Sequence, residues 1–171
     1  MKKFIILLLL LLLPLGGCID KHELEDSNFV IILGLDKAGT DVNVTVSFPL
    51  TQSTERSGEY ETTSMSAPTA IEALGKMNEE LPGELAIHSV KTVVISKAFE
   101  EDGADSLYTL WRQTELRSTA ALLICDGSAG AFVRERVENA LCDPLRQEEL
   151  MLERDKPLQL LDYIKHLYAK R

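Results

Sequence analysis

The residue whose chemistry is best defined by its surroundings is Cys18, because its thiol follows a glycine pair at the end of a short apolar run. Two lysines precede an unbroken apolar stretch at residues 4–15, and Gly16 and Gly17 lead directly into the cysteine. A basic start, a short apolar middle and small residues before a cleavage point are typical of a secretory signal peptide. The 12 apolar residues are too few to cross a bilayer core, which takes about 20. We therefore predict that residues 1–17 are a signal peptide.

The small pair followed by a cysteine also resembles the lipobox of bacterial lipoproteins. In that motif the cysteine sulfur receives a diacylglycerol, and cleavage, here between Gly17 and Cys18, leaves the cysteine as the first residue. The alternative is a plain secretory signal with an incidental cysteine. Two acyl chains suffice for stable anchoring, since each buried CH₂ contributes about 0.8 kcal/mol. We expect an exported protein that is tethered to the membrane through Cys18 and carries no other cofactor.

Two further cysteines, Cys125 and Cys142, allow two interpretations. A disulfide between them would close a loop of about 17 residues and stabilise the fold by roughly 3 kcal/mol in the chain-entropy model. Alternatively, both are free thiols that pack as small hydrophobic groups. We favour free thiols, because two cysteines do not make a disulfide framework. We expect no metal site, because none of the histidines has ligand spacing from a cysteine: His22, His88 and His166.

The sequence shows no candidate pair of a nucleophile and a general base. The chain contains no G-x-S-x-G and no H-E-x-x-H, and Ala70 stands where a phosphate-binding loop ending in Gly75-Lys76 would need a glycine. The segment Gly127-Ser128-Ala129-Gly130 is better explained as a strand-to-helix junction than as a nucleophile turn. His88 is better explained as a core or rim histidine than as a general base. We predict that the protein is not an enzyme.

Charge narrows the partners that the chain can bind. The net charge is −9, and removal of the two signal-peptide lysines takes it to about −11. Such a domain is repelled by nucleic acid backbones and by anionic lipid headgroups. Nucleic acid is therefore an unsuitable partner, and membrane attachment has to come from the acyl chains.

Periodicity predicts the elements that build the domain. Residues 18–28 are polar and are expected to form a tether. Residues 29–35 form an apolar run and residues 42–48 alternate, which together predict a β-hairpin. The remaining predicted elements are, in order, a strand at 60–66, a helix at 67–81 capped by Ser66 with Pro68 in its first turn, a central strand at 86–95, a helix from 104, a strand at 119–125, a helix from Ser128 and a last helix from Pro157.

This order predicts an α+β fold, in which a mixed, largely antiparallel sheet has helices packed on one or both faces. Residues 29–171 are expected to form a single domain with a helical C-terminal tail. The apolar stripe of that last helix, which includes Leu160 and Ile164, is most simply explained by packing on its own domain. The alternative is an exposed face that once bridged to a further domain.

Several pieces, taken in order, resemble the Ger(x)C lipoproteins, the C subunits of bacterial spore germinant receptors. They are the start at Cys18–Asp26, the strand end Gly34-Leu35-Asp36, the helix segment Ala70–Leu74, the strand His88–Ile95 and the segment Arg112–Arg117. The family's usual Trp after the lipid-bearing cysteine is Ile19 here, and its usual Asp-Pro is Gln113-Thr114. Family members continue into further domains, and this chain resembles the first of them.

The resemblance implies a non-enzymatic role in nutrient-triggered spore germination. It implies a lipoprotein on the outer face of the spore's inner membrane, working beside two membrane-embedded subunits, of A and B type. Held there by its lipid, a folded surface would bind those partners in an effectively intramolecular way. Two other functions remain alternatives: a lipid-anchored module or scaffold that binds a small solute unaided, and a lipid-anchored hydrolase.

Overall fold

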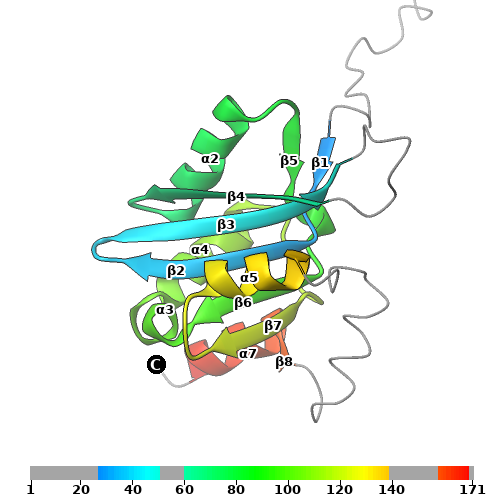
Figure 1. The fold of residues 1–171 in the computed structure, drawn as a ribbon. Helices are drawn as coiled ribbons and strands as arrows, with labels where there is room; N and C mark the ends of the chain where they lie inside the picture. The colour runs from blue at the N-terminus through cyan, green and yellow to red at the C-terminus, as the bar shows by residue number, and fades with distance from the viewer. Residues whose placement is uncertain (1–26, 51–59, 139–157, 170–171) are drawn as a thin grey trace, which may run out of the picture.

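A six-stranded mixed sheet runs through the centre of the molecule in the computed structural model, which describes residues 27–50, 60–138 and 158–169 (Figure 1). Its strand order is β4-β3-β2-β6-β7-β8. These strands are β2 (Ile32–Ala38), β3 (Asp41–Pro49), β4 (Tyr60–Ala67), β6 (Thr92–Ser96), β7 (Ala121–Cys125) and β8 (Leu158–Gln159). A small parallel sheet pairs β1 (Ser27–Phe29) with β5 (Glu84–Ala86).

Within the described ranges the chain also forms five α-helices and one short 3₁₀ helix. They are α2 (Ala70–Glu80), η3 (Ile87–Ser89), α3 (Lys97–Asp102), α4 (Ala104–Gln113), α5 (Ala129–Glu138) and α7 (Leu160–Ala169). Strands β2, β6 and β7 are parallel to one another, whereas β3, β4 and β8 each run antiparallel to a neighbour. The predicted α+β fold with a mixed sheet and packed helices is confirmed.

The predicted β-hairpin forms, and β3 lies where the period-2 pattern placed it, but the first strand is β2 at 32–38 instead of 29–35, and Phe29 belongs to β1. The pairing extends from Ile32 opposite Ser47 to Ala38 opposite Asp41, and Gly39 takes a positive φ of 64° in the turn. A side chain at that φ would be strained, so a glycine suits this turn position. Alternate residues of β3 point to opposite faces of the sheet, so its valines enter one core while Thr45 lies on the other face.

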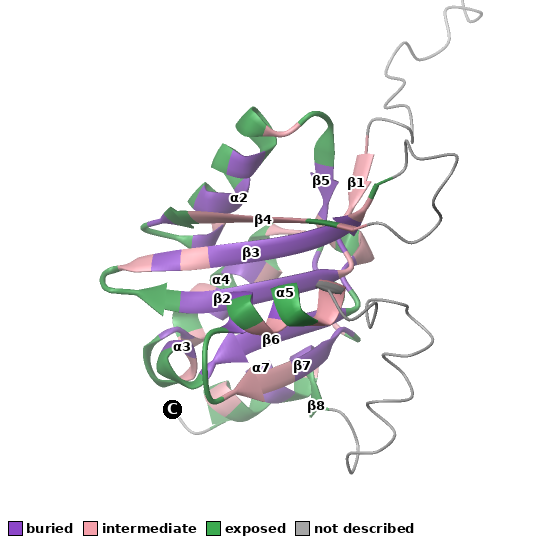
Figure 2. Ribbon diagram, viewed as in Figure 1, coloured by how far each residue is buried: buried purple, intermediate pink, exposed green. Residues whose placement is uncertain are grey.

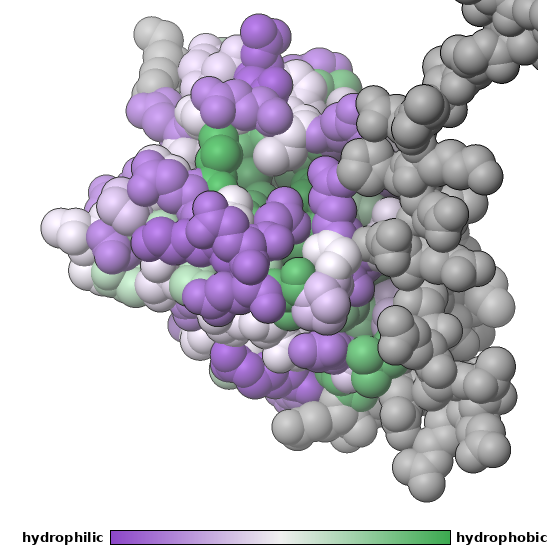
Figure 3. Space-filling view, turned by 90° about the horizontal axis from the view of Figure 1, so that it is seen from above, coloured by the Kyte–Doolittle hydropathy of each residue, from purple (hydrophilic) through white to green (hydrophobic). Residues whose placement is uncertain are grey.

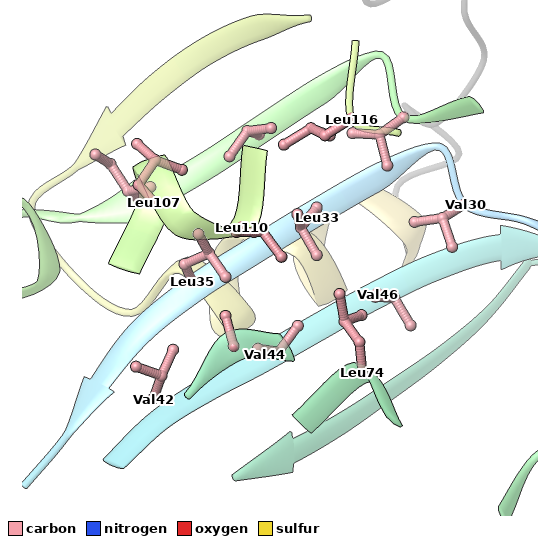
Figure 4. Close-up of a cluster of buried hydrophobic side chains, with 14 of the residues drawn as sticks. Val30, Leu33, Leu35, Val42, Val44, Val46, Leu74, Leu107, Leu110 and Leu116 are labelled. Atoms are coloured by element: carbon pink, nitrogen blue, oxygen red, sulfur yellow. The ribbon is translucent and has the colours of Figure 1, made fainter. Parts of the chain in front are cut away.

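The two faces of the sheet are covered unequally. On the first face, side chains from β2, β3, α2 and α4 form the main core, with Leu33, Leu35 and Leu110 almost fully buried (Figure 4). On the second face, α5 crosses the strands in front of the sheet in Figure 1, over a small cluster of four buried residues. These are Ile32, Val94, Ala129 and Val133. Figure 2 shows the central strands buried between the two layers.

The last helix packs on its own domain, as its stripe predicted. Leu160 and Ile164 in α7 are 0% and 4% exposed, whereas Tyr168 near its end is 40% exposed. The exposed-face interpretation therefore does not apply to the centre of the stripe. Tyr168 stacks on Tyr108 of α4 with 4.6 Å between ring centroids, which ties the two helices together.

Three further local predictions differ from the structure, and two elements were not predicted. The strand predicted at 86–95 is divided: Ala86 ends β5, residues 87–89 form η3, and β6 starts only at Thr92. Ser66 lies in β4, and Thr69 caps α2 instead, with its hydroxyl accepting the Glu72 N–H at 3.2 Å. Helix α3 and the short strand β8 were not predicted. Ser27 and Asn28, placed in the tether by composition, pair with β5 as part of β1.

Candidate functional site

The predicted lipid-attachment site, Gly17 and Cys18, lies outside the described residues, as does Cys142. Within the described ranges, no helix is both long and apolar enough to span a membrane. The same ranges contain no group of three or more His, Cys, Asp or Glu residues placed to hold a metal ion.

Among the described residues, the carboxylate of Asp36 near the end of β2 is 8% exposed and accepts three hydrogen bonds. Its Oδ1 accepts the backbone N–H of Ala129 at 2.7 Å, and its Oδ2 accepts the N–H of Gly130 at 2.8 Å. The Ser128 hydroxyl also donates to Oδ2 at 2.8 Å. Asp36 therefore caps the N-terminus of α5 across 93 residues of sequence, where a negative charge is stabilised by the helix dipole.

Two glycines allow α5 to approach the sheet beside this carboxylate. A Cβ on Gly34 would lie 3.1 Å from Val133 Cγ2 and 3.3 Å from the backbone of Ala129. A Cβ on Gly130 would lie 2.6 Å from Thr45 Oγ1. Neither position has room for a larger residue unless the helix moves away from the strands. Gly34 and Asp36 are thus adjacent parts of one docking surface for α5.

A polar network extends from this docking surface across β3 and β4. Thr45 Oγ1 and Ser64 Oγ are 2.9 Å apart, and Arg134 Nη2 of α5 donates to Ser64 Oγ at 2.6 Å. Two residues farther along the paired strands, on the same face of the sheet, Ser47 lies opposite Thr62. The side-chain oxygens Ser47 Oγ and Thr62 Oγ1 are buried and have no hydrogen-bond partner among the described residues. A buried hydroxyl pair of this kind is satisfied when an ordered water joins it.

The two residues considered as catalytic candidates, Ser128 and His88, contact other side chains instead of each other. The Ser128 hydroxyl donates to Asp36 and accepts the Ala131 N–H at 3.2 Å, so it belongs to the helix cap. His88 lies in η3 with its side chain 53% exposed, its Nδ1 3.9 Å from Glu115 Oε2. Neither residue faces the other in a nucleophile–base contact among the described hydrogen bonds. The strand-to-helix junction predicted at residues 127–130 is confirmed.

Charged and sulfur groups gather where the parallel strands end. Burial, followed by the charge of Asp36, raises the pKa of the Cys125 thiol, which opposes formation of the reactive thiolate. Lys97 hydrogen-bonds Asp126, which raises the pKa of the lysine and lowers that of the carboxyl. Cys125 is a half-buried free thiol whose Sγ lies 3.3 Å from the Gly127 carbonyl oxygen. This arrangement is suited to holding structure rather than to nucleophilic chemistry.

A cleft of about 330 Å³ opens at the hairpin end of the sheet, between the start of α2 and the α3–α4 junction. Val42 and Phe99 contribute apolar walls, and the ion pair between Lys37 and Asp102 spans from β2 to α3 beside them. Hydroxyl and carboxylate groups of Thr69 and neighbouring residues contribute the polar part of the lining. The volume falls within the range of small-molecule sites, about 300–1,000 Å³.

Two comparisons with known proteins both give matches that are described as spore germination proteins. A family model described as "Spore germination protein N-terminal domain" matches residues 20–171. The chain is 29% identical over 152 residues to the "Putative spore germination protein YfkR" of Bacillus subtilis (strain 168). That alignment covers 81% of this chain and 40% of the relative, so the chain spans about two fifths of the relative's length. No solved structure matches the chain significantly.

Proposed function

The chain belongs to the spore germination protein family defined by this N-terminal domain, and on that basis we propose that it is a lipid-anchored, non-catalytic subunit of a spore germinant receptor. The family match over residues 20–171 carries the proposal. In this proposal the domain sits on the outer face of the inner spore membrane beside A- and B-type membrane-embedded subunits. It contributes a folded binding surface to nutrient-triggered germination.

The physical properties of the chain support this role. The sequence before residue 20 has the pattern of a lipoprotein signal ending at Cys18, and the diacylglycerol would hold an acidic domain at a surface that its charge does not attract. Tethering replaces a three-dimensional search for partners by an effectively intramolecular one. The described polar networks, centred on Asp36, serve the fold and leave the outer surfaces of the domain for partner contacts.

The anchor is tested by metabolic labelling with radioactive palmitate. The full chain should incorporate the label, and Cys18→Ala should lose it while retaining the folded domain, which far-ultraviolet circular dichroism would verify. Cys125→Ala is the matched control and should keep the label, because its thiol lies within the folded domain. Label that persists in Cys18→Ala would disprove attachment at this residue.

The receptor role is tested in spores of the source organism. Deletion of the gene should slow the fall in optical density that follows addition of a nutrient germinant, and the wild-type gene supplied elsewhere should restore it. The Cys18→Ala gene should restore it incompletely. Germination of the deletion strain at the wild-type rate with every nutrient germinant tested would contradict the receptor role.

The cleft at the hairpin end favours one second candidate, an independent lipid-anchored protein that binds a small solute. Its volume suits such a ligand, and its lining combines apolar walls with an ion pair. Titration of the isotope-labelled protein with amino acids, sugars and nucleosides would test it by nuclear magnetic resonance. Saturable shifts confined to residues such as Thr40, Thr69 and Thr109 would favour this candidate, and uniform absence of shifts would reject it.

A further inference from the structure

Strand β4 is the terminal strand of the six-stranded sheet, and its outer side faces no other described strand. All eight of its residues pair with β3 on the inner side, from Val42 opposite Ala67 to Pro49 opposite Tyr60. The outward backbone N–H and C=O groups of an edge strand are a template for one further strand. The chemistry of this edge therefore specifies an extended polypeptide as its partner.

Natural monomers protect long edges, and the sequence of β4 itself carries few of the usual protective features. Short edge strands, lysines, prolines and bulges are the common devices. The opposite terminal strand, β8, follows this rule with two residues. In contrast, β4 has eight residues, contains no proline and no lysine, and carries a single charged side chain, Glu61. Figure 3, viewed from above, shows mainly hydrophilic residues on this side of the molecule, around a smaller apolar area.

We infer that β4 is an association edge through which two copies of this chain pair, antiparallel, to join their sheets. Isologous pairing about a two-fold axis at the middle of the strand places either Thr63 or Ser64 opposite its own copy. With Ser64 on the axis, Thr62 faces Ser66 of the second copy and Glu61 faces Ala67. With Thr63 on the axis, Glu61 faces Met65.

This self-complementarity is what favours a second copy over another strand. In both registers the hydroxyl-bearing residues of one face meet hydroxyl-bearing residues, and cross-strand Ser/Thr pairs are stabilising. In neither register does Glu61 meet Glu61, so the only charge of the strand creates no like-charge contact. About six to eight backbone hydrogen bonds would form along the joined edge. The inference rests on the edge itself and does not require the proposed receptor role.

The experiment is disulfide trapping in the full chain. Cys125 and Cys142 are replaced by serine, and a single cysteine is then introduced as Thr63→Cys or Ser64→Cys. Leu158→Cys is the matched control, because Leu158 is 42% exposed and lies at the opposite edge of the sheet. After mild oxidation of membranes and of detergent extracts, at least one of the two β4 variants should give about tenfold more disulfide-linked dimer than the control.

Salt provides a second, independent readout. Each copy carries a net charge of −9, or about −11 once residues 1–17 are removed, so raising the ionic strength from about 0.05 to 0.5 M should increase the dimer by screening repulsion. Both β4 variants trapping no more dimer than Leu158→Cys, with unchanged fluorescence of the single tryptophan, would overturn the inference. Trapping of a different protein on β4 would also overturn it, in favour of a heterologous strand. The background without an added cysteine measures any contribution from Cys18.

Discussion

Replacement of Asp36 by asparagine, whose side chain has nearly the same volume, should weaken the attachment of α5 to the sheet. The carboxylate accepts three hydrogen bonds, from two backbone N–H groups and the Ser128 hydroxyl. An asparagine offers one carbonyl oxygen, and its amide nitrogen would face donors. With that oxygen in the position of Oδ2, the contacts from Gly130 and Ser128 remain, and the Ala129 N–H loses a charged acceptor, a contact worth about 1.5–3 kcal/mol. The favourable charge at the helix N-terminus is lost as well. We expect a loss of about 3 kcal/mol from a total stability on the order of 5–15 kcal/mol.

The assay combines denaturant unfolding with amide hydrogen exchange. Because about 1.4 kcal/mol corresponds to a factor of ten, amides of α5 should exchange on the order of 100-fold faster in Asp36→Asn. Amides of β6 in the main core should change less, since α5 covers only the smaller second-face cluster. Asp126→Asn is the control, because its carboxylate is exposed and paired only with Lys97. An exposed pair of this kind contributes about 0–1 kcal/mol.

The result that would refute this reasoning is equal behaviour of the two variants. If Asp36→Asn unfolded at the same urea concentration as Asp126→Asn, the three hydrogen bonds to Asp36 would contribute nothing beyond an exposed ion pair. The capping role would then be wrong. If all amides accelerated together, α5 would unfold only with the whole domain, and its description as a separately docked layer would fail.

Three further predictions concern single contacts. Gly130→Ala should destabilise the fold by about 1–3 kcal/mol, because its Cβ would clash with β3. Gly75→Ala should stabilise the fold by about 0.5–1 kcal/mol, because its Cβ would meet nothing within 4 Å. Paired urea melts measure both changes. Burial, and secondarily Glu100, raises the pKa of Tyr163 to about 12. Above pH 10 the unfolded chain therefore loses this proton before the folded chain does, so the stability falls as pH rises. In melts between pH 9 and 11, the Tyr163→Phe variant should show a smaller fall in stability than the original chain. Thr69→Ala should cost about 0.5–2 kcal/mol by thermal unfolding, and a smaller change than Ser66→Ala would place the cap of α2 elsewhere.

Periodicity predicted the parts of the fold whose packing is local. Strands β3 and β4 and helices α2 and α5 lie close to where alternation or helical spacing placed them, because one face of each meets a core. The region 86–95 was read as one strand because its apolar residues are nearly continuous. The chain instead turns through η3, where the Ser89 hydroxyl lies 2.6 Å from the Ala86 carbonyl oxygen and 2.8 Å from that of Val30. The contact with Val30 spans 59 residues of sequence and leaves no trace in a local window.

The docking of α5 could not be predicted for a similar reason. Asp36 looks like a turn residue in the sequence, and Ser128 looks like an ordinary N-cap. Only the sheet topology brings them together, since β2 and the start of α5 are separated by five strands in sequence order. A period-2 analysis does place Gly34 and Asp36 on one face of β2, which was the available signal. It did not indicate that a helix lies over that face.

The segment Gly34-Leu35-Asp36, one of those that resemble the family, shows that such a motif can serve the fold and need not mark a binding site. Leu35 enters the main core and is fully buried, while its two neighbours point to the opposite face. Gly34 leaves room for the backbone of α5, and Asp36 holds that helix by its first N–H groups. All three residues are therefore accounted for by the assembly of two layers on one strand. Since the contacts of Asp36 serve the fold, the features of the described domain that we propose for solute or partner contacts lie elsewhere, at the cleft of the hairpin end and at the outer edge of β4.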